Sequence, residues 1–168
     1  MKYFIYLFLL SALAFGCQVK FNMTGGGTVD PNLKSMTIAN FTNESRLNVP
    51  YLAQQFTQEL RDRFRSQSRL SLSDANGDIQ LSGAIVDYMI NPVAISGGTG
   101  GATQNRLEIT VKVKYENMLN PKENWEKPFK AFFDFPQSTD LASNEQKLIS
   151  QVTEQLTQNI FTESLGKW

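Results

Sequence analysis

The side chain best placed for a covalent reaction is the thiol of Cys17, the single cysteine of this 168-residue chain. Before it stand one positive charge, Lys2, and an uncharged, largely apolar run from Tyr3 to Phe15. As a helix this run measures about 20 Å and is shorter than the roughly 20 residues that span a bilayer, so we predict a cleaved signal peptide over residues 1–16. A Gly-Cys pair at the cleavage point can take a diacylglyceryl thioether, and we therefore predict lipidation at Cys17.

The alternative is that Cys17 is an incidental cysteine beside an ordinary cleavage site. Lipidation is favoured because Cys17 is the only cysteine in the chain and lies where a lipidation sequence needs it. A lone cysteine also excludes an internal disulfide and a thiolate metal site. The pattern departs from the usual lipidation sequence at one point, since Ala14 stands where Leu is common and Leu13 lies one place earlier. Gln18 follows the cysteine, not the Asp that retains enterobacterial lipoproteins at the inner membrane, and no acidic surface-export run follows. We therefore expect a lipid-anchored protein on the periplasmic side of the outer membrane.

The rest of the chain offers little that could act as a catalyst. Histidine, the commonest general base and metal ligand, is absent from the sequence. Asp74 and Asp78 flank a predicted turn, and turn chemistry explains them better than a metal site. The glycines between Ser96 and Thr103 are not followed by Gly-Lys-Ser/Thr, so the nucleotide interpretation fails and a mobile hairpin tip is expected. We predict a protein that is not an enzyme and holds no metal or cofactor; a hydrolase with an unfamiliar carboxylate site is the weaker alternative.

Charge and composition divide the chain into an anchor, a tether and one domain. Removing residues 1–16 takes away only Lys2 among the charged side chains, which leaves 15 basic and 16 acidic residues and a net charge of −1. This balance argues against a nucleic-acid partner. Residues 17–33 are polar and glycine-rich, and we expect them to form a flexible tether behind the lipid. Residues 34–168 are then long enough for one folded domain.

The spacing of apolar residues predicts two amphipathic helices. Pro50 suits the first turn of a helix, and apolar residues then recur at steps of four at Leu52, Phe56, Leu60 and Phe64. A second helix is expected to begin at Ser143, where Gln146 completes a capping pattern. Its apolar stripe is formed by Leu148, Val152, Leu156 and Ile160.

Alternation with a period of two predicts strands that are covered on one side only. The most regular segments are 79–85 and 107–116, and a further strand over 125–135 places Phe129, Ala131, Phe133 and Phe135 on one face. Segments 34–41 and 70–73 are expected to form two shorter strands. The order β-α-β-β-β-β-α predicts an α+β fold: a two-layer sandwich with two helices packed on one face of an antiparallel sheet of about four strands.

Two features of this sheet are candidate binding surfaces. Arg106, Lys112 and Lys114 lie on the predicted polar face and could bind phosphates, but the favoured interpretation is a solvated face that also carries Glu108 and Glu116. The consecutive Phe132 and Phe133 point to opposite faces, so one of them lies outside a two-layer core. We expect either a covering loop or a partner surface there, and the partner-surface candidates are Phe132, Phe135, Pro136 and Gln137.

At this segment the sequence resembles the LptE family of lipopolysaccharide-assembly lipoproteins, and in particular its Bacteroidota branch. The resemblance rests on Phe132-Phe133-Asp134-Phe135-Pro136-Gln137, on Leu141-Ala142-Ser143-Asn144-Glu145-Gln146 and on Gln155-Leu156. Gly77-Asp78-Ile79-Gln80-Leu81 and Asn105-Arg106-Leu107 extend it toward the N-terminus. The order of elements and the lipidation sequence agree as well, so the resemblance covers nearly all of the mature chain.

The resemblance implies a non-catalytic plug that binds the outer-membrane β-barrel LptD and lipopolysaccharide, and that helps insert lipopolysaccharide into the outer leaflet. Some relatives carry basic residues in the hairpin tip and before the Asn-Glu-Gln segment. Here the tip from Ser96 to Gln104 is uncharged and Ala142-Ser143 precede Asn144, so Arg106, Lys112 or Lys114 would have to supply the charge. The alternative is a generic periplasmic lipoprotein that binds another amphiphile or envelope protein.

Overall fold

The computed structural model describes residues 31–47, 49–94 and 103–165. The predicted lipidation site Cys17, most of the predicted tether and the centre of the predicted hairpin tip lie outside these residues. In chain order the elements are β1 (Ser35–Ile38), β2 (Thr42–Asn43), α2 (Leu52–Gln67), β3 (Ser71–Leu72), β4 (Ile79–Ala94), β5 (Thr103–Asn117), the 3-10 turn η1 (Pro121–Glu123), β6 (Trp125–Pro136) and α3 (Leu141–Leu165).

The two-layer α+β architecture is confirmed, but the sheet is mixed and has six strands within the described residues. Strands β4, β5 and β6 form the expected antiparallel meander, and β1 lies between β3 and β4 and is parallel to both. β2 also runs parallel to β4. The expectation of a purely antiparallel sheet of about four strands was therefore wrong. A parallel neighbour needs a crossover connection, and α2 supplies it by returning the chain from β1 to β3 and β4.

Strand β4 extends far beyond the predicted segment 79–85. A register shift between Ile85 and Asp87 inserts Val86 as an extra residue, and its side chain is 39% exposed. Burial resumes at Tyr88, three residues after Ile85, so the strict alternation that marks a strand in the sequence is broken there. Because of the bulge, a period-of-two pattern in the sequence predicted only the first half of this strand.

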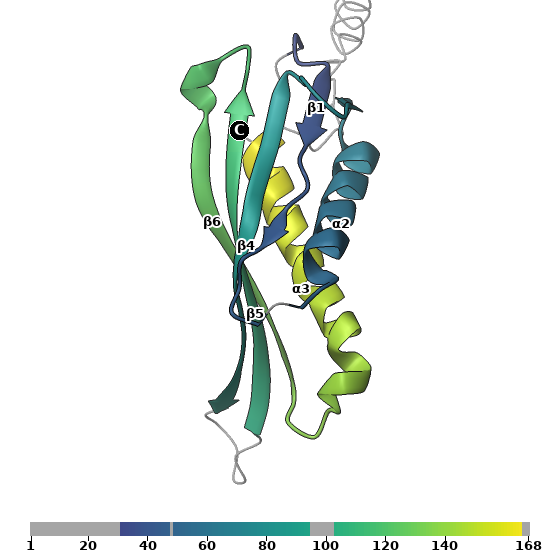
Figure 1. Ribbon diagram of the computed structural model, residues 1–168, viewed down its shortest axis with the longest axis vertical. Helices are drawn as coiled ribbons and strands as arrows, with labels where there is room; N and C mark the ends of the chain where they lie inside the picture. The colour runs from purple at the N-terminus through teal and green to yellow at the C-terminus, as the bar shows by residue number, and fades with distance from the viewer. Residues whose placement is uncertain (1–30, 48, 95–102, 166–168) are drawn as a thin grey trace, which may run out of the picture.

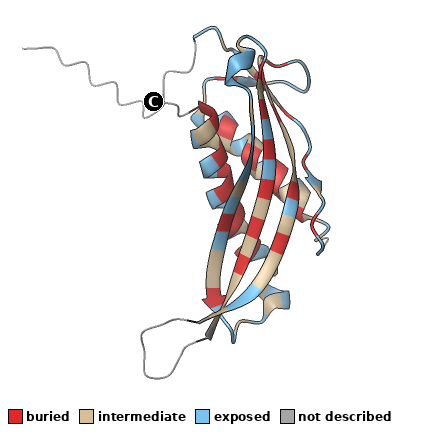
Figure 2. Cartoon of the chain, turned by 90° about the vertical axis from the view of Figure 1, so that its left-hand side faces the viewer, coloured by how far each residue is buried: buried red, intermediate tan, exposed pale blue. Residues whose placement is uncertain are grey.

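Both predicted helical stripes are buried against the inner face of the sheet, which confirms the two-layer core (Figures 1 and 2). The buried stripe of α2 consists of Leu52, Phe56, Leu60 and Phe64, and that of α3 includes Leu148, Ile149, Val152, Leu156 and Ile160. Helix α3 begins at Leu141 and not at Ser143, and Asp140 just before it accepts a 2.5 Å hydrogen bond from the Ser143 hydroxyl.

One glycine is required by the close approach of strand and core. At Gly83 on β4, a β-carbon would lie 2.1 Å from the carbonyl oxygen of Lys112 and 2.7 Å from Cε1 of Phe41. Any larger residue would therefore push β5 away or displace Phe41 from the core.

Candidate binding surface

The face of the sheet opposite the helices carries the predicted basic residues. Arg106, Lys112 and Lys114 all belong to β5 and alternate with the buried residues that face the helices. Lys112 and Lys114 are neighbours on this outer face and line the same shallow hollow. Arg106 lies six residues from Lys112, about 20 Å along the strand, so the structure does not bring all three together.

Arg106 is held in place by two neighbours on β6. Its Nε and Nη2 atoms donate to the two carboxylate oxygens of Asp134 at 2.7 and 2.8 Å, and its guanidinium lies 3.8 Å from the ring centroid of Phe132. The hydrogen bonds from Arg106 lower the pKa of Asp134, and the same hydrogen bonds raise the pKa of Arg106. A bidentate pair with a stacked ring fixes the guanidinium, and the bonds to Asp134 take two of its five N–H donors.

The two lysines are also paired. Lys112 Nζ lies 2.5 Å from Glu126 Oε1 of β6, and Lys114 Nζ lies 2.8 Å from Glu116 Oε1 of the same strand. The hydrogen bond from Lys112 lowers the pKa of Glu126 and raises that of Lys112. Because both lysines are at least half exposed, an incoming anion could replace the carboxylate of either pair at little cost.

The hollow beside these lysines is formed where small residues of β4 meet the short strand β2. Its lining comprises Thr42, Glu44, Ser82, Gly83, Ala84, Val86, Lys112, Lys114 and Glu126. Sequence reasoning missed Thr42 and Glu44, because a strand of two residues has no recognisable period. The hydrogen bond from Glu44 N to Ile85 O, 2.8 Å long, shows how β2 is attached to the sheet.

The aromatic segment of β6 is divided between the two faces. Phe132 is 43% exposed on the outer face, which confirms that one of the consecutive phenylalanines lies outside the core. Phe135 is only 3% exposed and belongs to the core, so its inclusion among the partner-surface residues was wrong. The correction follows from strand geometry, since Phe135 shares the inner face with Ala131. Pro136 and Gln137 are exposed at the end of the strand.

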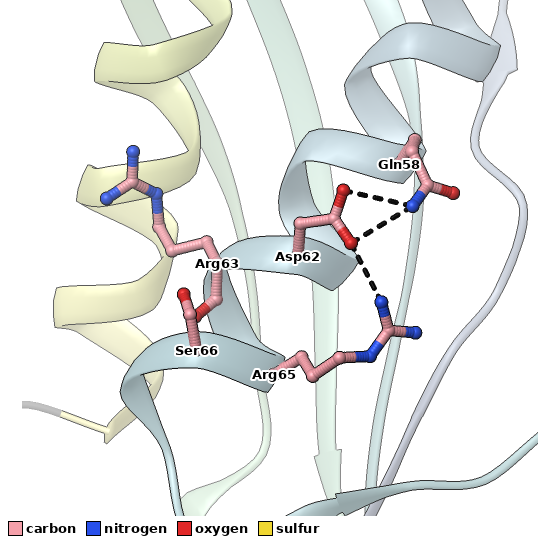
Figure 3. Close-up of polar contacts among 5 residues, drawn as sticks. All are labelled: Gln58, Asp62, Arg63, Arg65 and Ser66. Carbon is pink, nitrogen blue, oxygen red and sulfur yellow. Dashed lines mark hydrogen bonds and ion pairs between the residues drawn. The ribbon is translucent and has the colours of Figure 1, made fainter.

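On the other side of the molecule, polar side chains join the two helices to each other. Arg63 of α2 reaches α3 and donates from Nε to Thr157 Oγ1 at 3.0 Å, whereas Arg65 points away and pairs with Asp62 at 2.8 Å (Figure 3). The Asp62 carboxylate also accepts from Gln58 (Figure 3). The contact of Arg63 joins the two helices, whereas the contacts of Asp62 lie within α2.

Glu145, in the motif that carried the resemblance, joins both layers. Its carboxylate accepts from Tyr51 Oη at 3.1 Å and from Tyr88 Oη at 2.9 Å, which connects the start of α3 to the start of α2 and to β4. Burial raises the pKa of both tyrosines, and the hydrogen bonds to Glu145 add to this. Both hydroxyls therefore stay protonated and serve as donors.

Comparison with known families decides what this fold belongs to. The lipopolysaccharide-assembly model of LptE matches residues 33–164. The chain belongs to the LptE family. It is therefore a non-catalytic lipopolysaccharide-assembly lipoprotein of the cell envelope. No curated protein matches the sequence.

Solved structures share the fold at low sequence identity. A hypothetical protein from Chlamydia trachomatis matches with a TM-score of 0.52 and 9% identity, over 80% of this chain and 99% of its own. A putative neuraminyllactose-binding hemagglutinin homologue from Helicobacter pylori matches with a TM-score of 0.51 and 12% identity, over 82% and 86%. A minor lipoprotein from Acinetobacter baumannii is 17% identical over 76% and 90%, with a TM-score of 0.43. At these identities the first two likenesses show the fold alone.

Within the described ranges, the helices are too short or too polar to cross a membrane. In the same part of the chain, no group of three or more His, Cys, Asp or Glu side chains is placed to hold a metal ion.

Proposed function

We propose that this LptE-family chain is the plug subunit of a lipopolysaccharide translocon, anchored by Cys17 on the periplasmic side of the outer membrane. It binds an LptD-like β-barrel and assists the insertion of lipopolysaccharide into the outer leaflet. The observation that carries the proposal is the family match, which covers nearly the whole folded domain, residues 33–164.

The shape of the domain supports a role inside a barrel. Strand β4 has 16 residues and so measures about 53 Å, and helices cover one face of the sheet only. The other face carries alternating charges on β5 and β6. The lumen of an outer-membrane barrel is polar, so a long domain with an uncovered polar face suits it.

For lipopolysaccharide, we propose Lys112 and Lys114 as the first contacts for phosphate groups. They are adjacent, about half exposed and paired with carboxylates in an open hollow. Arg106 is a weaker candidate, because Asp134 already takes two of its N–H donors and Phe132 covers one face of its guanidinium. A phosphate would replace the carboxylate in the ion pair of each lysine, and this replacement costs little because surface ion pairs are weak.

The test of the barrel partner is purification of the affinity-tagged, full-length lipoprotein from detergent-solubilised membranes. We expect a large β-barrel protein to co-purify in a fixed ratio. Recovery of the chain alone, together with normal surface lipopolysaccharide after its depletion, would contradict the proposal.

The test of the lipid contact is photo-crosslinking in cells. A crosslinker in place of Lys112 should capture lipopolysaccharide, and the same group in place of Gln158, exposed on α3, should not. Capture of phospholipid in place of lipopolysaccharide at position 112 would instead identify a lipoprotein that binds another amphiphile.

A further inference from the structure

The turn between β5 and β6 exposes two adjacent apolar side chains that the plug function does not explain. Met118 is 58% exposed and Leu119 is 52% exposed. They follow the last residue of β5, at the end of the molecule where β1 begins (Figure 1). The two side chains are contiguous, and contiguous exposed apolar surface marks protein or membrane interaction sites.

The turn is a preformed support for this pair. Asn117 is 2% exposed, and its Oδ1 accepts from the backbone N–H groups of Leu119 at 2.9 Å and Asn120 at 3.0 Å. Glu123 accepts from Nδ2 of Asn117 and Nδ2 of Asn120, both at 2.9 Å. These bonds satisfy the backbone of the turn from within, so Met118 and Leu119 are displayed without being needed to close it.

Stacked aromatic rings lie beneath the turn. The ring centroids of Tyr115 and Trp125 are 5.2 Å apart with an interplanar angle of 5°. These two residues are partners in the β5–β6 ladder and form its pair nearest to the turn. The stack gives the turn a rigid base, which lowers the entropic cost of inserting its tip into another phase.

The turn lies beside the point where the N-terminal segment enters the domain. The backbone N–H of Met118 donates to the carbonyl of Asp78 at 2.8 Å. The side-chain carboxylate of Asp78 accepts from the backbone N–H groups of Lys34 and Ser35, each at 2.9 Å. Asp78 therefore connects the turn to the first residues of the folded domain.

Cys17 lies 17 residues before Lys34, so this end of the domain has the shortest covalent link to the predicted lipid. From this juxtaposition we propose that Met118 and Leu119 insert into the phospholipid surface that holds the acyl chains of Cys17, and so orient the domain on the membrane. The inference rests on the lipid anchor in the proposed function. The exposed Lys122 of the same turn matches anionic headgroups and keeps its ammonium in the interface.

The test uses the full-length lipidated protein bound to vesicles of phosphatidylethanolamine and phosphatidylglycerol. Lipidation blocks Cys17, so Leu119→Cys carries a single free thiol, which is labelled with an environment-sensitive fluorophore. We expect a blue shift of its emission and quenching by doxyl-labelled lipids. The matched control is Leu47→Cys, since Leu47 is equally exposed, at 55%, but follows β2, which pairs with the middle of β4.

The outcomes separate this inference from the barrel proposal, because the vesicles contain neither barrel protein nor lipopolysaccharide. Protein that floats with the vesicles while the probe at position 119 stays as aqueous as the probe at position 47 overturns the membrane contact and leaves the barrel proposal standing. A chain that does not float with the vesicles overturns it as well. Shielding of position 119 only when a barrel protein is added would assign the pair to a protein partner and reject the lipid contact.

Discussion

The two faces of strand β5 share one backbone but are stabilised by different interactions. On the inner face, Leu107, Ile109, Val111, Val113 and Tyr115 are between 0% and 4% exposed. On the outer face, charged residues alternate with them and pair with neighbours along or across the sheet, as Lys112 does with Glu126 and Lys130 with Glu108. The inner face depends on removal of apolar surface from water, and the outer face on local charge pairing.

The largest effect in this comparison is expected when the inner layer loses volume. Leu156 of α3 is 0% exposed, and Leu156→Ala should lower the free energy of unfolding by about 2–5 kcal/mol through lost burial and the cavity left behind. Urea denaturation followed by circular dichroism measures this. Gln155→Ala, a change at the exposed neighbour on the same helix, is the matched control and should stay within about 0.5 kcal/mol. Equal small changes for both variants would show that α3 does not cover a core.

The second effect should depend on pH and distinguishes the two faces. Arg106 lowers the pKa of Asp134 in the folded chain, so this pair contributes stability above the unfolded pKa of about 4. That contribution is lost as the pH falls through the lowered folded pKa. Asp134→Asn should therefore lower the unfolding midpoint temperature at pH 6, and its difference from the unchanged chain should shrink as the medium is acidified below about pH 4.

The matched comparison for this titration is Leu156→Ala, whose deficit comes from packing and should persist across the same pH range. If the deficit of Asp134→Asn stayed constant down to strongly acidic pH, the stability contributed by the Arg106–Asp134 pair would not depend on the charge of Asp134.

The smallest effect is expected at the lysine proposed to bind phosphate. Lys112→Ala should leave the unfolding midpoint unchanged within error, because its ion pair with Glu126 is half exposed and surrounded by water. Differential scanning calorimetry at low and high salt measures this. A clear salt-dependent loss of stability would show that the outer pairs hold the sheet together and are not available for exchange.

Much of the fold could be predicted from the sequence because its signals are local. The four-residue steps from Leu52 to Phe64 and from Leu148 to Ile160 identified both helices, and the alternation around Val111 identified β5. What could not be predicted depends on partners distant in the sequence. The parallel pairing of Met36 with Ile79 joins residues 43 positions apart and has no local pattern, and the bulge at Val86 interrupts the one pattern β4 has.

The candidate surface shows the same division. The alternation placed Arg106, Lys112 and Lys114 on one face, but the partners of Arg106 and Lys112 lie on β6 and follow from its register against β5, which brings Arg106 opposite Asp134. The burial of Phe135 follows from the alternation of β6 itself, which places it on the inner face with Ala131. The face on which a side chain lies can thus be predicted from one strand. Whether a charge on that face is paired depends also on the neighbouring strand.

Strand β6 forms one edge of the sheet in the described part of the chain. The residues along this edge affect whether two copies of the protein can associate through it. Pro128 lacks the backbone N–H that a further strand would need, and Lys127 and Lys130 place positive charge along the same edge. Proline and lysine at an open edge discourage two copies from joining sheet to sheet and growing into an aggregate. This envelope lipoprotein therefore carries its own protection against self-association along that edge.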